Sequence, residues 1–204
     1  MRSFWLLAAM VTLSVTFVRP VVTFAQVDEI HFNLFPIPSI LKCLARFPDD
    51  PSRPPLAEAR IERGVNNDKL KLFLRNIKPG LAFDLFTVQR SRLLANGSLD
   101  PAFTNFGLAW YQSDLEADSG GAETVLVRTI LLDQIFGFDP DVALAPTNTF
   151  HLGFWFNDPN DATACGFTGF TPFNGEHHAG PLAMISVPDP VTHLGPLCTK
   201  ASCP

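Results

Sequence analysis

The polar cluster with the most definite chemistry is the run Asn174-Gly175-Glu176-His177-His178. Carboxylate and neutral imidazole are good ligands for zinc or copper, and His151 offers a further nitrogen. Adjacent residues of an extended chain point to opposite sides, however, so a single ion does not readily take both His177 and His178. Spaced ligand motifs such as HExxH are missing from the sequence. The sequence therefore predicts solvated histidines and no cofactor, with a zinc or copper site at His151, Glu176, His177 and His178 as the alternative.

Three aromatic residues, Trp110, Tyr111 and Trp155, point to a second kind of chemistry. Their positions on alternating stretches predict that at least one ring faces outward. Exposed rings bind the apolar faces of carbohydrate or protein ligands, and neighbouring carboxylates such as Asp114 and Glu116 bond ligand hydroxyls. Core packing is the alternative for these rings, because the chain contains 19 phenylalanines. Trp110, Tyr111 and Trp155 are therefore the candidate binding residues.

Nucleophilic catalysis has little support in the sequence. Ser113 or Ser186 with one of the five histidines would be needed for a hydrolase, but no G-x-S-x-G motif exposes a serine at a strained turn. Cysteine nucleophiles require reduced thiols, which export disfavours. We therefore expect no catalytic residue and a protein that binds or scaffolds. The rival hypothesis is a metal-dependent extracytoplasmic enzyme that uses the Glu176–His178 segment and His151.

The first 25 residues have the pattern of a secretory signal peptide. Arg2 supplies a positive start, and Phe4–Val18 is an apolar run without charge, shorter than the roughly 20 residues of a membrane span. Thr23-Phe24-Ala25 offers small residues for cleavage before Gln26. An uncleaved membrane anchor is the alternative. This pattern predicts a secreted, periplasmic or cell-envelope protein with no stable membrane insertion after cleavage.

Charge limits the partners of the mature chain. Once Arg2 and Arg19 are removed with the signal, 13 basic residues remain against 20 acidic ones, which is a net charge of −7. An acidic chain without a basic patch does not bind nucleic acid or an anionic membrane by charge. A protein or carbohydrate partner is therefore expected, and no nucleic acid.

All four cysteines lie beyond the predicted cleavage site, and an even number in an exported chain favours disulfides. Cys198 and Cys203 enclose only four residues, so one pairing closes a small loop there and joins Cys43 to Cys165. The other pairing that we consider joins Cys165 to Cys198 and Cys43 to Cys203. A structural zinc site lacks the paired CxxC motifs that such sites use.

The elements that must position these residues are mainly strands. Asp68–Arg90 reads as two strands joined by a turn at Lys78-Pro79-Gly80, because leucines alternate in the first half and Pro-Gly favours a turn. Phe106–Glu116 and Ala122–Leu132, separated by Ser119-Gly120-Gly121, read as a second hairpin.

Further alternating runs predict strands at 26–35, 56–64, 149–156 and 182–187, and helical signals predict short helices at 36–47 (with Ser39 as N-cap), 133–136 and 158–164. About eight short strands with little helix favour an all-β fold, an antiparallel two-sheet β-sandwich of immunoglobulin-like topology. We expect a signal peptide at 1–25, an N-terminal segment with a Pro-rich linker at 26–55, and a sandwich domain at 56–204.

The stretch Leu74-Arg75-Asn76-Ile77-Lys78-Pro79-Gly80-Leu81 resembles the strand–Pro-Gly–strand hairpin of secreted β-sandwich (immunoglobulin-like) modules of bacterial envelopes. The resemblance covers about a third of the mature chain. It implies an extracytoplasmic accessory or binding module and assigns no functional residue.

Overall fold

A computed structural model describes residues 29–64, 67–130, 137–147, 149–169, 171 and 179–198. The predicted signal peptide, the helical turn at 133–136 and the Glu176–His178 segment lie outside these residues. The strands are β1 (Glu29–Pro36), β2 (Leu56–Glu62), β3 (Asp68–Arg75), β4 (Ala82–Val88), β5 (Ala109–Glu116), β6 (Glu123–Ile130), β7 (Gly137–Asp139), β8 (Leu144–Thr147), β9 (Thr149–Phe156), β10 (Leu182–Ser186) and β11 (Leu197–Cys198). None of the helices in the described part of the chain is long and apolar enough to cross a membrane.

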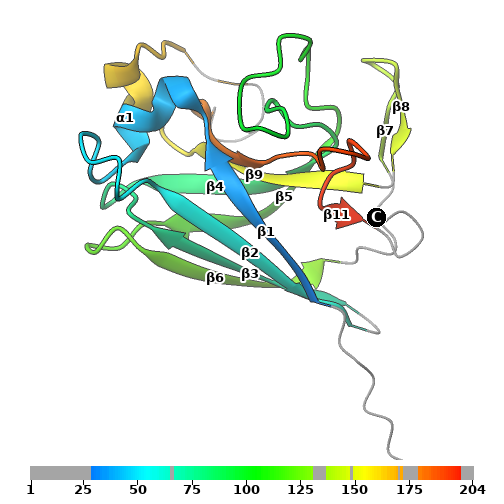
Figure 1. The fold of residues 1–204 in the computed structure, drawn as a ribbon, viewed down its shortest axis with the longest axis horizontal. Helices are drawn as coiled ribbons and strands as arrows, with labels where there is room; N and C mark the ends of the chain where they lie inside the picture. The colour runs from blue at the N-terminus through cyan, green and yellow to red at the C-terminus, as the bar shows by residue number, and fades with distance from the viewer. Residues whose placement is uncertain are drawn as a thin grey trace, which may run out of the picture.

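Nine of these strands form one antiparallel sheet in the order β5-β4-β9-β10-β1-β2-β3-β6, with β11 added beside β9. The two edge strands, β5 and β6, contact each other, so the sheet curls until it is nearly closed. In Figure 1 the strands β4, β5 and β9 run nearly horizontally, whereas β1, β2, β3 and β6 run diagonally, so the two halves of the sheet lie at an angle to each other. The predicted all-β antiparallel class is confirmed. In place of the two separate sheets that we expected, one continuous hydrogen-bonded path runs through both halves.

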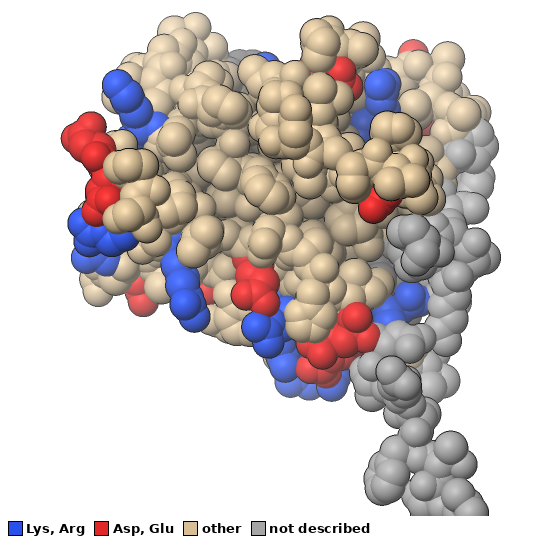
Figure 2. Space-filling model, viewed as in Figure 1, with Lys and Arg blue, Asp and Glu red and all other residues tan. Residues whose placement is uncertain are grey.

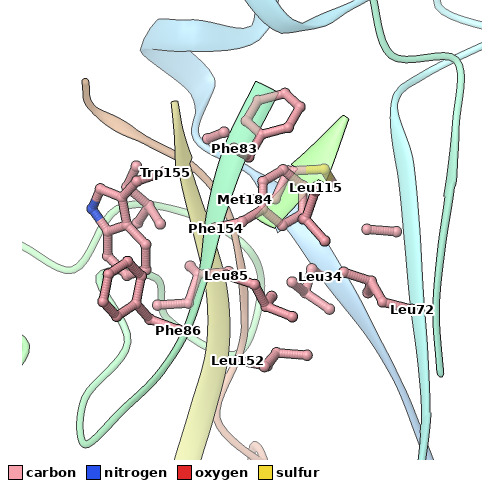
Figure 3. Packing of buried hydrophobic residues seen from close by; sticks show 14 of the residues in the cluster. Leu34, Leu72, Phe83, Leu85, Phe86, Leu115, Leu152, Phe154, Trp155 and Met184 are labelled. Carbon is pink, nitrogen blue, oxygen red and sulfur yellow. The ribbon is translucent and has the colours of Figure 1, made fainter. Parts of the chain in front are cut away.

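The core lies between the two halves of this sheet. Leu34 of β1 and Leu72 of β3 face Leu85 of β4 and Phe154 of β9, and all four side chains are buried. Figure 3 shows a second buried layer on the opposite side of β4 and β9, which contains Phe86 and Trp155. The β4 and β9 strands are therefore covered on both faces, which explains their nearly uncharged sequences.

The two predicted hairpins are wrong in their pairing, although the turns lie where expected. β3 pairs with β2 and β6, whereas β4 pairs with β5 and β9. The Lys78-Pro79-Gly80 turn therefore carries the chain from one half of the sheet to the other, and the turn between β5 and β6 carries it back. Turn chemistry shows where a chain changes direction, but it does not show which strand becomes the neighbour.

The two crossing turns are bonded to each other at one corner of the molecule. The amide of Gly80 donates to the carbonyl of Ala117 (2.8 Å), and the amide of Ala117 donates to the carbonyl of Leu81 (2.9 Å). The amide of Ile77 also donates to the carbonyl of Gly121 (3.1 Å). Ile77, Leu81, Ala117 and Gly121 are buried, so these bonds provide partners for backbone groups that lie outside the strand pairing and have no access to water.

Gly121 and Gly80 offer a matched test of this corner. Both have positive φ (71° and 76°), but a Cβ on Gly121 would overlap the Ile77 carbonyl whereas a Cβ on Gly80 meets no atom within 4 Å. Gly80→Ala should cost only the left-handed backbone term, ~1–2 kcal/mol. Gly121→Ala adds a steric term of similar size, for a total of ~2–5 kcal/mol in urea unfolding. Equal losses for the two variants would contradict the close contact.

Two short helical segments close this end of the molecule. The predicted helix over 36–47 is a 3₁₀ turn, Pro38–Ile40 (η1), followed by a single α-turn, α1 (Leu41–Leu44). Ser39 is not its N-cap, because no side chain caps either segment and the proline at the start of η1 sets the entry.

The predicted helix over 158–164 is confirmed as the 3₁₀-helix η3 (Pro159–Cys165). Asp158 caps it by accepting from the amide of Asn160. A disulfide joins Cys43 of α1 to Cys165 of η3. This is the first of the two pairings considered, and the Cys165–Cys198 pairing is wrong. Cys203 lies outside the described residues, so the Cys198–Cys203 bond stays a prediction.

Candidate functional site

The three candidate binding aromatics lie in very different environments. Trp155 is only 1% exposed, and Trp110 is partly buried with its ring 5.2 Å from the ring of Phe150. Tyr111 is 54% exposed on the edge strand β5. The outward ring predicted for this set is therefore Tyr111, while the core packing considered as the alternative is the position of Trp155.

Tyr111 is the exposed end of a row of aromatic rings. The row runs inward from Tyr111 and ends at two rings of the loop formed by residues 89–108. Successive ring centroids are 5.7, 5.5, 5.1 and 4.6 Å apart, with interplanar angles of 60–84°. Such edge-to-face geometry is the favoured arrangement for aromatic pairs. We call this set the aromatic row: Tyr111, Phe86, Trp155, Phe106 and Phe103.

Two carboxylates and an amide adjoin the exposed end of the row. Asp114 lies on β5 and accepts a hydrogen bond from the phenol of Tyr111 (2.8 Å). Asp84 lies opposite Asp114 in the β4–β5 register, is buried, and accepts from the side-chain amide of Asn157 (3.1 Å). Partial burial and the nearby carboxylates raise the pKa of Tyr111 to about 12, so the phenol stays protonated at neutral pH.

This arrangement suits binding more than catalysis. The Tyr111 ring is fixed by Phe86 on one side and by Asp114 through its hydroxyl, so little side-chain entropy is lost when a ligand packs on it. The exposed carboxylate of Asp114 accepts hydrogen bonds from ligand hydroxyls, and Glu116 is exposed two residues further along β5. A ring with flanking acceptors is the arrangement that holds a sugar or a polar protein side chain.

His151, the candidate metal ligand that the structure describes, is buried at 4% exposure on β9. Its Nδ1 lies 3.1 Å from both the carbonyl oxygen and Oγ of Ser186. The Oγ of Ser186 also accepts from the amide of Leu152, and Ser186 is 1% exposed. This Ser–His pair ties β9 to β10 and gives the hydroxyl no access to a substrate.

The metal site itself is not tested by these positions. Glu176, His177 and His178 lie outside the described residues, and the described part of the chain holds no group of three metal-ligating side chains. The zinc or copper alternative at these residues stays a prediction.

Burial of His151 has a consequence for acid stability. Desolvation lowers the pKa of His151 to about 4 in the folded protein, below the ~6.5 of an unfolded histidine. Between these values the unfolded chain binds a proton that the folded chain excludes, so stability is complete above pH ~6.5 and falls as the pH drops toward 4.

We expect the free energy of unfolding to fall by ~2 kcal/mol more between pH 7 and pH 5 in the wild type than in His151→Gln. Urea titrations at the two pH values measure the difference. His31, which is exposed and whose imidazole lies 3.0 Å from Glu29, provides the control variant His31→Gln. Equal pH dependence in the wild type and His151→Gln would show that His151 titrates normally.

Sequence reasoning missed several residues of this site. Phe86 and Asn157 carry no local signal for a role in this site, because Phe86 packs on Tyr111 from β4 and Asn157 bonds Asp84 from the turn after β9. Asp84 does give a signal, since a lone carboxylate in an otherwise apolar strand needs a partner when it is buried. The hairpin β7–β8 and the short strand β11 were also missed, as their three-, four- and two-residue lengths are too short for a period.

Comparisons with protein-family models, with curated proteins and with solved structures gave no match to this chain.

Proposed function

We propose that this protein is an exported, non-catalytic binding module that holds a carbohydrate ligand at the Tyr111 end of the aromatic row. The observation that carries the proposal is the exposed but fixed phenol ring of Tyr111, with Asp114 as its hydrogen-bond partner. A ring of this kind packs on the C–H face of a sugar, and carboxylate oxygens accept from its hydroxyls.

The extracytoplasmic location rests on two independent features. The first 25 residues have the charge and apolar pattern of a signal peptide. The Cys43–Cys165 disulfide is consistent with an oxidising compartment. Together these two features support an accessory role in the periplasm, in the cell envelope or outside the cell.

Tyr111 is the only tyrosine of the chain, which makes a direct test simple. Protein labelled with 3-fluorotyrosine gives one ¹⁹F resonance, and it can be titrated with glucose, N-acetylglucosamine, cellotriose, maltotriose and chitotriose. We expect at least one sugar to shift this resonance saturably. If none of these probes shifts it, the carbohydrate proposal fails.

Variants locate the binding site by calorimetry with the sugar that binds. Tyr111→Ala should weaken affinity at least ~10-fold, whereas Tyr111→Phe, which keeps the ring, should retain most of it. Phe138 on β7 is a matched control because it is an aromatic residue of similar exposure, 47%, on another element. Phe138→Ala should bind as the wild type does, and an equal loss for both alanine variants would refute the assignment to Tyr111.

A further inference from the structure

A second candidate site lies on the outer face of β1, β2 and β3, away from the aromatic row. A hollow of about 420 Å³ opens there, within the size range of small-molecule sites. Asn33, Glu58 and Phe73 lie side by side in the register of three neighbouring strands and line the hollow. Leu56 and Arg75 form the next pair along, and Arg60 lies on the other side.

The charges in this hollow do not cancel. Glu58 is held by Arg60 at 2.7 Å, and this hydrogen bond lowers the pKa of Glu58, so both groups stay charged and compensate each other. Arg75 is exposed, and its side chain makes no hydrogen bond or ion pair within the described residues. The charge of Arg75 also helps to lower the pKa of Glu58, but the three charged groups that line the hollow, Glu58, Arg60 and Arg75, still sum to one positive charge. The whole chain, in contrast, has a net charge of −5.

The charges on the surrounding surface, in contrast, are largely paired. Figure 2 shows blue and red side chains alternating along the lower edge of the molecule, where β2, β3 and β6 lie in Figure 1, while the centre of this view is nearly free of charge. Lys69 and Lys71 of β3 both bond Glu62 of β2, at 3.2 and 2.9 Å. Glu58 and Glu62 are therefore hydrogen-bonded to other cations, and the guanidinium of Arg75 keeps its donors for a ligand.

The apolar part of the hollow lies next to this guanidinium. Phe73 is partly buried, and the guanidinium carbon of Arg60 lies 5.4 Å from its ring centroid. Leu56, which pairs with Arg75, is 50% exposed. A ligand that uses both parts of the hollow needs a planar anionic group to bind Arg75 and an apolar group to pack against Phe73 and Leu56. A carboxylate fits this guanidinium in bidentate geometry.

We propose that this hollow binds a small organic carboxylate with an aromatic or aliphatic body, taken either as a free acid or as the C-terminal residue of a peptide. Arg75 binds the carboxylate, and Phe73 with Leu56 packs against the body. Asn33 supplies an amide beside them. This site is independent of the Tyr111 surface, so either proposal can fail without the other.

The test is an NMR titration of ¹⁵N-labelled mature protein with N-acetylphenylalanine and, as the matched neutral probe, N-acetylphenylalaninamide. We expect saturable shifts of β2 and β3 amides with the acid and at least tenfold weaker binding of the amide. N-acetylglycine, which has the carboxylate without the ring, should also bind at least fivefold more weakly. Equal binding of the acid and the amide would overturn the proposal.

Variants assign the charge. Arg75→Gln should reduce affinity for the acid to the level of the amide. Arg128 is a matched control because it is exposed on β6 outside the hollow and likewise has no side-chain hydrogen bond or ion pair among the described residues. Arg128→Gln and Tyr111→Ala should both bind the acid as the wild type does. If Arg75→Gln binds as tightly as Arg128→Gln, the hollow is not the site.

A hexapeptide ending in phenylalanine, compared with its C-terminally amidated form, distinguishes the two sources of the carboxylate. Tighter binding of the free-acid peptide than of N-acetylphenylalanine assigns the hollow to a peptide C-terminus. Binding of the peptide no tighter than the amino acid assigns it to a free acid. Binding of the amidated peptide as tightly as the free-acid peptide would contradict carboxylate recognition.

Discussion

Removing the Cys43–Cys165 disulfide should lower the free energy of unfolding by ~2–5 kcal/mol. The bond joins α1 to η3, and its two cysteines are 122 residues apart in sequence, so the cross-link restricts most of the unfolded chain. It also holds α1 at the corner where the chain crosses between the halves of the sheet. There the amide of Lys78 donates to the carbonyl of Leu44, and Ala45 bridges Ile77. Urea unfolding of the variants measures the loss.

Single and double variants separate the cross-link from local packing. Cys43→Ala, Cys165→Ala and the double variant should lose similar stability, because removing either sulfur opens the same loop. A double variant that is much less stable than both singles would indicate that each sulfur also contributes packing of its own, since Cys43 is buried and Cys165 packs against the core. Unchanged stability in all three would contradict the role of the bond.

The alternation of apolar and polar residues predicted the strands well where one face of the strand is buried and the other is exposed to solvent. In β2, Ala57, Ala59 and Ile61 are buried while Glu58, Arg60 and Glu62 are more exposed, as their order indicates. In β9 the predicted bounds are correct, but every residue is buried. Alternation there reflects two covered faces, one toward the other half of the sheet and one beneath loops.

Strand pairing was less predictable than strand position. The turns at 78–80 and 119–121 join strands that are adjacent in sequence but lie in different halves of the sheet. The residues of these turns favour a reversal of chain direction. The strands that pair with β3 and β4, however, depend on contacts with strands that are distant in sequence. One sheet that curls and two stacked sheets bury nearly the same faces, so the hydrophobic pattern does not distinguish them.

The candidate site was predictable only in part, for a related reason. Periodicity places Tyr111 and Trp155 on defined sides of their strands, but it does not show which side a later loop covers. The ring centroid of Phe106, from the loop that follows β4, lies 5.1 Å from that of Trp155, which is 1% exposed, whereas Tyr111 is 54% exposed. The outer hollow was missed because Arg75 and Phe73 have the sequence pattern of an ordinary solvated strand face.

Trp155→Ala should be among the most destabilising single substitutions in the protein, with a loss of ~3–5 kcal/mol. The side chain is buried at 1% exposure, and its ring lies 5.5 Å from Phe86 and 5.1 Å from Phe106. Truncation would leave a cavity in the middle of the aromatic row and remove the support of the Phe86 ring against which Tyr111 packs. Urea unfolding followed by circular dichroism measures the loss without relying on the deleted fluorophore.

Tyr111→Ala is the matched variant at the exposed end of the same row, and it should cost ~1 kcal/mol or less because most of this ring is already in water. Trp155→Phe keeps an apolar ring in the site and should lose less than Trp155→Ala, so it serves if the alanine variant does not fold. The middle and the exposed end of the row thus differ in their measured effects, because substitution of Trp155 lowers stability and substitution of Tyr111 lowers ligand affinity. A Tyr111→Ala loss as large as that of Trp155→Ala would mean that Tyr111 belongs to the core and has no ring free to bind a ligand.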